Sequence, residues 1–207
     1  MDEARLLIGL TGSIGAGKST VAAIIEQHYP VLNTDRIARD IMEHDDAVRD
    51  ALTEEFGVQA YLSDGSLNRT FLAELVFEDE KKLAMVNSIV HPPTVLEVRR
   101  LAREFHAEGR RLVFVESALI YEAGLDEEFD YIVAVISDME TALLRIMKRD
   151  DLTERHVRRR MRLQLPPEEK AELADFTIRN NSTLEALEKS TNVILSILSR
   201  LQPRPSE

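Results

Sequence analysis

The sequence predicts a three-layer α/β fold, with a parallel sheet of about five strands between layers of helices. Short apolar runs rich in valine and isoleucine alternate along the chain with longer segments of helical pattern. A glycine-rich turn joins the first apolar run to the first helical segment. The 207 residues, of which 44% are hydrophobic and 30% charged, are enough for one folded domain with inserted lobes. Together these observations favour buried parallel strands connected by helices.

Four apolar runs are the clearest strand candidates, and a weaker fifth lies near the C-terminal end. They are Leu6 to Leu10, Pro30 to Thr34, Leu112 to Glu116, Tyr131 to Ile136 and Phe176 to Asn180. Periodicity alone does not separate runs this short from buried helix. Their β-branched residues, and the helical segments between them, favour strands.

Seven segments have the pattern of helices, and several begin at a capping residue or end near a glycine. They are Lys18 to His28, Asp35 to Phe56, Thr70 to Phe77, Lys81 to Glu108, Asp138 to Arg149, Thr153 to Leu165 and Leu184 to Leu201. His91-Pro92-Pro93 interrupts the fourth segment, and a pair of this kind usually breaks a helix. Ser63-Asp64-Gly65 is a turn signal within a stretch that has no convincing strand.

Composition disfavours several classes of function. Lys and Arg total 26 against 37 for Asp and Glu, and the net charge of −11 disfavours general binding to nucleic acid or an anionic membrane. The absence of cysteine excludes disulfides, thiolate catalysis and cysteine-based metal sites. No apolar run approaches the roughly 20 residues of a membrane span, and the first residues lack a signal-peptide layout. We therefore expect a soluble, cytoplasmic protein with no evident obligate protein partner.

Residues 12–19 match the phosphate-loop pattern G-x-x-x-x-G-K-[ST] in full. Glycines let successive backbone N–H groups turn toward phosphate oxygens, and the following helix adds the positive end of its dipole. Lys18 can bridge the β- and γ-phosphates of ATP, and the Ser19 hydroxyl can bind Mg²⁺. The chain has no N-K-x-D sequence for reading guanine, and it is short for a large ATPase. A small ATP-dependent kinase is the class that remains.

Several acidic and polar residues follow the strand candidates, where ligands bind in open α/β sheets. Asp35 could align an acceptor hydroxyl and take its proton, or it could cap the helix that follows. Glu116 could be an acid near Mg²⁺, or an ordinary carboxylate at the end of a strand. Tyr121 and Glu122 could lie near the acceptor, or could be plain surface residues.

Arginines are concentrated in one part of this acidic chain. Arg145 and Arg149 are one helical turn apart, and we interpret them as a clamp that closes over the phosphates. For Arg158, Arg159 and Arg162 we favour a solvated helix face. A nucleic-acid patch is disfavoured because no aromatic residues alternate with these arginines to stack bases.

With these residues in view, the sequence resembles the dephospho-coenzyme A kinase family over nearly its whole length. The phosphate loop is shared with many kinases, whereas other matching segments are more particular to the family. The matching segments include Asp35-Arg36-Ile37-Ala38-Arg39, Asp64-Gly65-Ser66-Leu67-Asn68-Arg69, His91-Pro92, Leu119-Ile120-Tyr121-Glu122, and Arg160-Met161 with Gln164. The chain departs from common family residues at Ser13, Asn33, Ala118 and Ser182. Since aspartate is usual where this chain has Asn33, the retained Asp35 is expected to be the essential carboxylate.

The resemblance implies ATP-dependent phosphorylation of the ribose 3′-hydroxyl of dephospho-coenzyme A, the last step of coenzyme A synthesis. It assigns the catalytic roles to Asp35, Lys18, Arg145 and Arg149. It assigns ATP binding to Gly12, Gly15, Ala16, Gly17, Lys18, Ser19, Thr20 and Asn180, the last of these near the adenine. The expected acceptor-binding residues are Asp35, Arg39, His91, Tyr121 and Glu122.

The resemblance also implies three parts within the single domain. The nucleotide-binding core is expected in residues 1–56, 109–137 and 171–207, a helical acceptor lobe in 57–108, and a mobile lid in 138–170. Two rival functions stay open at this point. One is a kinase for another small acceptor, such as a nucleoside monophosphate, and the other is a nucleotide-binding module that has lost turnover.

Overall fold

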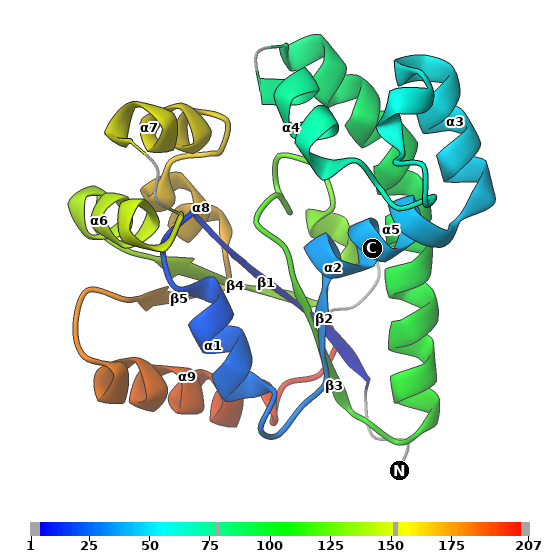
Figure 1. The fold of residues 1–207 in the computed structure, drawn as a ribbon. Coiled ribbons are helices and arrows are strands. Elements are labelled where there is room, and N and C mark those ends of the chain that lie inside the picture. The colour runs from blue at the N-terminus through cyan, green and yellow to red at the C-terminus, as the bar shows by residue number, and fades with distance from the viewer. Residues whose placement is uncertain (1–4, 78, 151–152, 204–207) are drawn as a thin grey trace. The chain divides into compact units, whose positions relative to one another are not determined.

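The computed structural model describes residues 5–77, 79–150 and 153–203, and the chain divides into two compact units (Figure 1). We call Met1–Leu32 with Ala102–Glu207 the sheet unit, and Asn33–Leu101 the helical unit. The expected acceptor lobe began at residue 57, whereas the compact helical unit begins at Asn33. The roles assigned to core, lobe and lid remain predictions.

The sheet unit is built on five strands in the order β2-β3-β1-β4-β5. Their bounds are β1 Leu6–Gly12, β2 Val31–Asn33, β3 Leu112–Glu116, β4 Tyr131–Ile136 and β5 Phe176–Arg179. β1 lies at the centre, in parallel register with β3 on one side and β4 on the other, and β4 pairs in parallel with β5. The predicted parallel α/β sheet is therefore confirmed, with β1 extending two residues beyond its predicted end.

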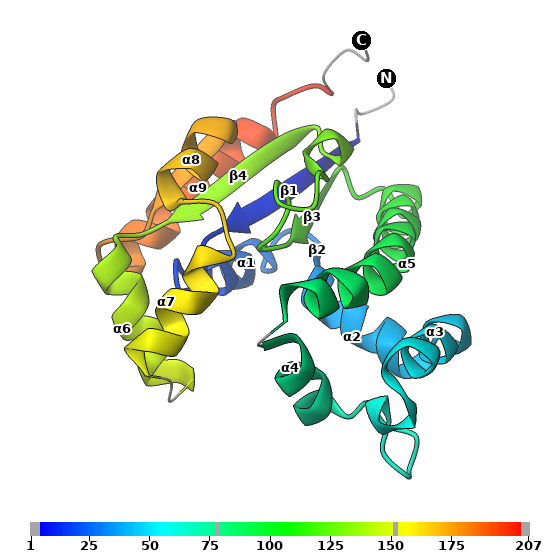
Figure 2. The ribbon, with the colours of Figure 1, turned by 90° about the horizontal axis from the view of Figure 1, so that it is seen from above.

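Helices cover both faces of this sheet (Figures 1 and 2). On one face lie α1 (Lys18–Ile25) and α9 (Leu184–Leu198), and on the other lies α8 (Pro167–Leu173). Alternate β1 residues Leu6, Ile8 and Leu10 are fully buried in the cluster that includes side chains of α1 and α9. Gly9 and Thr11, which point to the opposite face, are buried as well, as a central strand covered on both faces requires.

The helical unit begins with two helices where the sequence predicted one. The predicted helix from Asp35 to Phe56 divides at Asp45 into α2 (Thr34–His44) and α3 (Asp46–Phe56). Asp45 adopts an extended conformation, and its side chain accepts a hydrogen bond from Val48 N at 3.0 Å. An aspartate that can cap a new helix competes with continuation of the old one, which explains the break.

The long helix α5 (Glu80–Ala107) continues through Pro92 and Pro93, so the predicted break at His91-Pro92 is wrong. Val90, Thr94 and Val98 are buried on both sides of the prolines and repeat every four residues along one helix face. Burial of this face offsets the backbone hydrogen bonds that two prolines remove. The remaining elements of this unit are η1 Val58–Ala60 and α4 Arg69–Phe77, and the turn at Ser63-Asp64-Gly65 is confirmed by a hydrogen bond from Gly65 N to Leu62 O.

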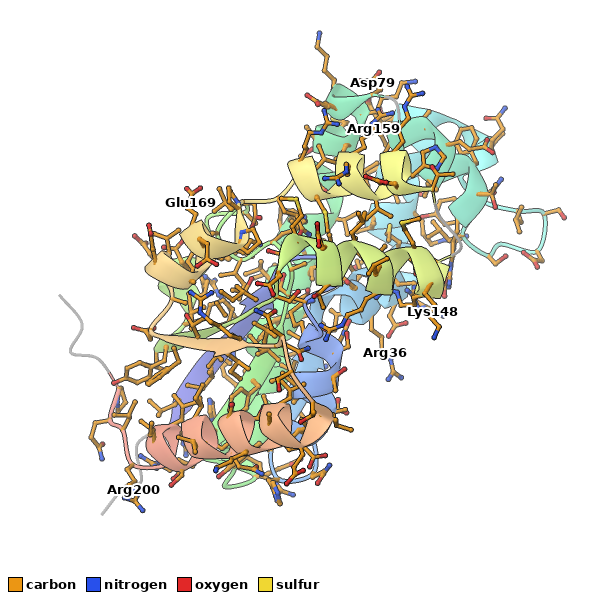
Figure 3. All side chains as sticks on the ribbon, turned by 90° about the vertical axis from the view of Figure 1, so that its left-hand side faces the viewer. Arg36, Asp79, Lys148, Arg159, Glu169 and Arg200 are labelled. Atoms are coloured by element: carbon orange, nitrogen blue, oxygen red, sulfur yellow. The ribbon has the colours of Figure 1, made fainter. Side chains whose placement is uncertain are left out.

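Two helices follow β4 in the chain, α6 (Met139–Asp150) and α7 (Glu154–Arg162). They are followed by α8, a helix that the sequence did not predict. Pro167 is the first residue of α8, a position that proline favours. Charged side chains such as Lys148 on α6 and Arg159 on α7 extend away from the ribbon (Figure 3). Arg158, Arg159 and Arg162 are exposed, as the solvated-face interpretation predicts.

Candidate active site

The phosphate loop connects β1, which ends at Gly12, to α1, which begins at Lys18. Gly15 and Gly17 have positive φ angles of 79° and 91°. A Cβ atom at Gly17 would lie 2.2 Å from Asn180 Nδ2, and one at Gly15 would lie 2.7 Å from the carbonyl oxygen of Ala142. Both positions therefore require glycine for conformation and for space, which confirms the strand–loop–helix context predicted for the motif.

Lys18, Ser19 and Glu116 meet at the mouth of this loop. Glu116, the last residue of β3, is 6% exposed. Its Oε1 accepts a hydrogen bond from Ser19 Oγ at 3.0 Å and lies 3.5 Å from Lys18 Nζ. Sequence left Glu116 undecided between a functional acid and an ordinary strand-end residue. The parallel pairing of β3 with β1 brings it to the loop, because the carboxyl ends of neighbouring parallel strands share one edge of the sheet.

Asn180 and Arg145, which lie far from the phosphate loop in sequence, are brought to it by the fold. The buried Asn180 side chain donates from Nδ2 to Ala16 O at 2.9 Å, and its backbone carbonyl accepts from Arg145 Nη1 at 3.2 Å. The structure thus brings two predicted site residues together at Ala16 and Gly17. A role of Asn180 near adenine stays a prediction, since its amide is engaged by the loop backbone.

Arg149 lies one turn after Arg145 on α6 but makes a different contact. Its Nε and Nη2 donate to the two carboxylate oxygens of Asp150 at 2.7 and 3.0 Å. This bidentate pair raises the pKa of the Arg149 guanidinium, with the hydrogen bond as the main cause. The Arg149 side chain is 63% exposed, so it is accessible to a ligand that competes with Asp150.

Glu122 and Tyr121 follow β3 in the loop that leads to η2 (Asp126–Glu128). Glu122 Oε1 accepts hydrogen bonds from Leu165 N and from Lys170 Nζ, both at 2.8 Å. The Tyr121 hydroxyl is buried and finds no hydrogen-bond partner among the described residues. Burial, with Asp126 nearby, raises the pKa of the Tyr121 phenol to about 12. Both residues therefore have a structural setting that the sequence did not indicate.

Lys170 is the residue of this region that sequence reasoning missed. It lies on α8 with no exposed surface, and its ammonium donates to Ala118 O at 2.6 Å besides pairing with Glu122. Burial is the largest influence and lowers the pKa of this ammonium, Glu122 raises it, and nearby Lys18 lowers it further. Nothing in the sequence around Pro167-Glu168-Glu169-Lys170 distinguishes a buried lysine from the exposed ones.

The candidate acceptor residues of the helical unit are described within that unit. Asp35 is the second residue of α2 and is exposed, whereas Asn33 caps the helix by accepting from Arg36 N at 2.9 Å. The interpretation of Asp35 as the N-cap is therefore wrong, and its carboxylate is not committed to capping. Arg39 follows one turn later on the same helix, also exposed. His91 is half-buried within α5, and this burial lowers the pKa of its imidazole.

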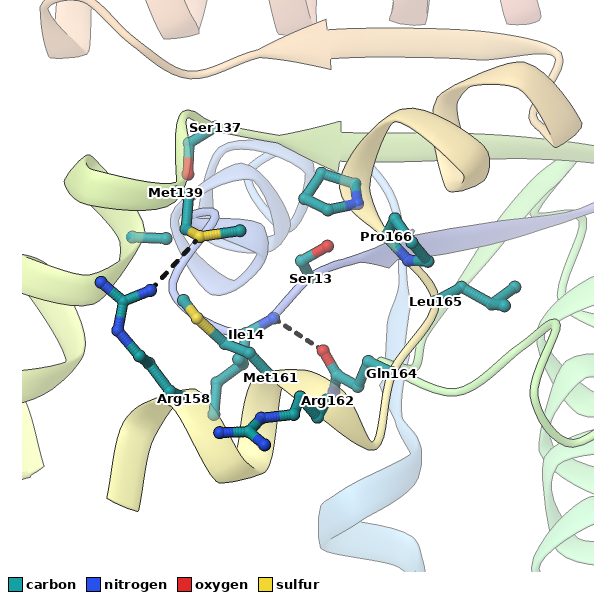
Figure 4. A pocket seen from close by; sticks show the side chains of 12 residues that line it. Ser13, Ile14, Ser137, Met139, Arg158, Met161, Arg162, Gln164, Leu165 and Pro166 are labelled. Carbon is teal, nitrogen blue, oxygen red and sulfur yellow. Dashed lines mark hydrogen bonds between the residues drawn. The ribbon is translucent and has the colours of Figure 1, made fainter. Parts of the chain in front are cut away.

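A cavity of about 530 Å³ lies beside the first part of the phosphate loop, within the sheet unit (Figure 4). Its walls come from Ser13 and Ile14 of the loop, from Met139 of α6, and from Met161 and Gln164 of α7 and the segment after it. The Gln164 carboxamide oxygen accepts a hydrogen bond from Ile14 N at 2.9 Å, drawn as a dashed line in Figure 4. The sequence contained Gln164 as part of a matching segment but gave it no role.

Within residues 5–77, 79–150 and 153–203, no three His, Cys, Asp or Glu side chains are gathered in a way that could hold a metal ion. Across the same ranges, each helix is too short or too polar to span a bilayer.

The central parallel sheet and the glycine loop with its Lys18–Ser19–Glu116 cluster define the chain as a kinase of the phosphate-loop class. A family model described as dephospho-CoA kinase (CoaE) matches residues 6–186, and the chain belongs to this family. A dephospho-CoA kinase of Corynebacterium glutamicum is 37% identical over 198 residues, which cover 95% of this chain and 99% of that relative.

Solved structures share this fold. The crystal structure of TT1252 from Thermus thermophilus has a TM-score of 0.76 and 36% identity, covering 94% of this chain and 98% of that chain. A dephospho-CoA kinase from Campylobacter jejuni has a TM-score of 0.65 and covers 95% of this chain and 99% of its own. At 23% identity, the second likeness supports the fold alone.

Proposed function

We propose that this protein transfers the γ-phosphoryl group of ATP to the ribose 3′-hydroxyl of dephospho-coenzyme A, giving coenzyme A and ADP. The observation that carries the proposal is the cluster of Lys18, Ser19 and Glu116 at a glycine loop, in a chain of the dephospho-CoA kinase family. In this transfer the bond from the γ-phosphorus to the β–γ bridging oxygen breaks. A bond forms from the acceptor oxygen to the same phosphorus, and the acceptor hydroxyl loses its proton.

ATP binds through the loop amides and Lys18, in the chemistry described for the motif. Lys18 is only 14% exposed at its side chain, so its charge acts on the phosphates with little screening by water. The loop backbone holds its shape through Asn180, whose amide is bonded to Ala16 O. A preformed cradle of this kind reduces the ordering that nucleotide binding requires.

Ser19 and Glu116 are the residues that would hold Mg²⁺. The fit rests on their chemistry: a hydroxyl and a buried carboxylate already share a hydrogen bond of 3.0 Å at the loop. Mg²⁺ is usually bound through one or two protein groups together with substrate phosphates and water, so a larger acidic cluster is not required. When bound, the ion neutralises charge on the phosphate oxygens.

Asp35 is proposed to align the acceptor hydroxyl and accept its proton. Its carboxylate is exposed and does not cap α2, which leaves it available for a substrate. Arg39, His91, Tyr121 and Glu122 are proposed to contribute to acceptor binding, as the resemblance implies. For Glu122 this role competes with its contacts to Leu165 and Lys170.

Arg145 and Arg149 are proposed to stabilise charge on the transferred phosphoryl group. Arg145 is held at the carbonyl of Asn180. Arg149 has an exposed guanidinium that a phosphate could draw from Asp150, because a phosphate, like a carboxylate, can accept two parallel hydrogen bonds from arginine. A cytoplasmic location and the absence of an obligate protein partner, both expected from the sequence, belong to this proposal.

The test is ADP release by the full-length protein with ATP-Mg²⁺, with and without dephospho-coenzyme A, together with mass detection of the product. We expect ADP formation that depends on the acceptor and yields coenzyme A. Asp35→Asn should lower kcat by about 100-fold or more with little change in ATP affinity, which is the effect expected of a lost general base. Asp40→Asn changes another exposed aspartate of α2 and should leave kcat unchanged. Transfer to a nucleoside monophosphate in place of dephospho-coenzyme A, or ATP binding without any product, would overturn the proposal.

A further inference from the structure

The backbone N–H of Ile14, in the phosphate loop, is hydrogen-bonded by a side chain far away in sequence. Ile14 N donates to Gln164 Oε1 at 2.9 Å, across 150 residues of sequence. Inside the loop, Ala16 N donates to Ser13 O at 3.1 Å. Ile14 is not among the loop residues assigned to ATP binding, which are Gly12 and Gly15 to Thr20, so its N–H needs an acceptor of its own. Gln164 supplies that acceptor and fixes the direction in which the loop leaves β1.

The Ile14 side chain is anchored by the same part of the chain. It packs against a cluster in which Leu143 and Ile146 come from α6 and Val157 from α7. Leu143, Ile146 and Val157 are buried to at least nine-tenths. The entrance to the phosphate loop is thus held at its backbone by Gln164 and at its side chain by α6 and α7.

Gln164 itself is held in place by its neighbours. Its backbone N–H donates to Met161 O at 3.2 Å, and the next residue, Leu165, donates to Glu122 Oε1 at 2.8 Å. Glu122 is in turn fixed by the buried Lys170. Because the backbone is already fixed on both sides of Gln164, its hydrogen bond to Ile14 N requires ordering of the side chain alone.

The chemistry of the carboxamide suits this position. A glutamine oxygen accepts from Ile14 N–H without bringing negative charge to a loop that must receive phosphates. A glutamate in the same place would make the same hydrogen bond and repel the nucleotide. The choice of a neutral acceptor is therefore informative about function as well as about stability.

We propose that Gln164 is a positioning residue for ATP: it preorganises the phosphate loop through Ile14 and couples the loop to α6 and α7. The claim that Gln164 favours ATP binding is argued from the geometry of the loop. The claim that it affects turnover rests on the proposed function. Loss of the hydrogen bond leaves the loop entrance free to adopt other conformations, which weakens nucleotide binding.

The test compares Gln164→Met, which is close in size and has no acceptor at Oε1, with Gln164→Glu, which keeps an oxygen there. Gln27→Met is the matched control, because Gln27 is an exposed residue of the same unit outside the loop. Two quantities are measured on the full chain: the hydrogen-exchange rate of the Ile14 amide without nucleotide, by NMR, and the dissociation constant of ADP.

Gln164→Met should raise the exchange rate of Ile14 at least several-fold and raise the ADP dissociation constant by about five- to tenfold, the effect of one lost hydrogen bond. Gln164→Glu should keep Ile14 protected and still weaken ADP binding, because of its charge. Gln27→Met should change neither quantity. In kinetics with varied ATP, Gln164→Met should raise the KM for ATP by a larger factor than it lowers kcat.

Two results would overturn the proposal. One is an unchanged ADP dissociation constant in Gln164→Met with a lowered melting temperature, which is the pattern of a purely structural contact. The other is tighter ADP binding in Gln164→Met, which would mean that Gln164 competes with the nucleotide. None of these measurements needs the acceptor, so they stand apart from the acceptor-dependent turnover that tests the proposed function.

Discussion

The buried pair of Lys170 and Glu122 allows a prediction whose magnitude follows from the structure. Lys170 has no exposed surface, and its ammonium has two acceptors, Glu122 Oε1 at 2.8 Å and Ala118 O at 2.6 Å. Glu122→Gln keeps the size of the side chain and an oxygen, but it removes the carboxylate that pairs with the ammonium of Lys170. The buried cation is then left with neutral acceptors.

Removing one partner of a buried ion pair typically costs 3–5 kcal/mol, because the remaining charge stays desolvated. The Glu122 side chain is 17% exposed, so we expect the lower end of that range, about 3 kcal/mol. For a chain of this length that corresponds to a decrease in Tm of about 6–12 °C. Lys170→Met removes the cation itself and should cost only about 1 kcal/mol, since Glu122 keeps its bond to Leu165 N.

The double variant Lys170→Met with Glu122→Gln tests whether the loss of stability in Glu122→Gln comes from an unpaired buried charge. It should be about as stable as Lys170→Met alone, because no buried charge remains to be left unpaired. Urea unfolding followed by circular dichroism gives the free energies. Hydrogen exchange of the β4 amides reports separately on the unit that contains Lys170. Additive losses of about 4 kcal/mol in the double variant would refute the reasoning.

The same variant has a predicted pH dependence. Burial already lowers the pKa of Lys170 below its ordinary value of 10.5, and losing Glu122 lowers it further. Between the folded-state pKa and 10.5 the unfolded chain binds more protons, so the stability of Glu122→Gln rises with pH relative to wild type. The loss of stability caused by Glu122→Gln should therefore shrink as pH rises toward 10.5, and a loss that stays constant would contradict a charged Lys170 as its cause.

Three further changes give distinct outcomes. Gly17→Ala should weaken ADP binding, measured by calorimetry, at least tenfold, since its Cβ would lie 2.2 Å from Asn180 Nδ2. Gly109→Ala is the control: Gly109 has φ 85° and open space among the described residues, so this change should cost about 1 kcal/mol of stability and leave ADP binding unchanged. Burial lowers the pKa of His91 below 6.5, so the stability it contributes is present above pH 6.5 and is lost as pH falls toward its folded value. The Tm of wild type should accordingly fall more between pH 7.5 and 5.5 than that of His91→Gln, and equal decreases would count against this assignment. Tyr121→Phe removes a buried hydroxyl without a partner in the described chain, so stability should be unchanged or higher; a several-fold rise in the KM for the acceptor would support its proposed contact, and an unchanged KM would exclude it.

The sequence predicted the elements whose signals are local. β3 and β4 begin and end at the predicted residues, and α1 begins at the predicted Lys18, because a short apolar run and a loop motif are properties of consecutive residues. α9 begins at the predicted Leu184, where Thr183 Oγ1 caps the helix by accepting a hydrogen bond from Ala186 N at 3.2 Å. Where local signals compete, the prediction was wrong. The capping aspartate Asp45 divided one helix, and burial along α5 carried another through two prolines.

Asn33 illustrates how a local departure from the family pattern can leave structure intact. Asparagine and aspartate are about equally good N-caps, so α2 keeps its cap where family members often have aspartate. The same observation removed the capping interpretation of Asp35. The sequence had left open whether Asp35 caps α2, and the hydrogen bond from Arg36 N to Asn33 shows that Asn33 is the cap.

By itself, the sequence determined the class of this protein and the chemistry of its phosphate loop, because the spacing of Gly12, Gly17, Lys18 and Ser19 specifies a backbone conformation directly. Only the tertiary structure decided what surrounds the loop. Glu116, Gln164 and Asn180 reach it across 97, 150 and 164 residues of sequence. These partners depend on the strand order β2-β3-β1-β4-β5, which places segments distant in the chain at one edge of the sheet. The burial of Lys170 has the same origin, since a lysine on an acidic helix becomes a buried cation only when that helix packs on the sheet and a carboxylate from another segment meets it.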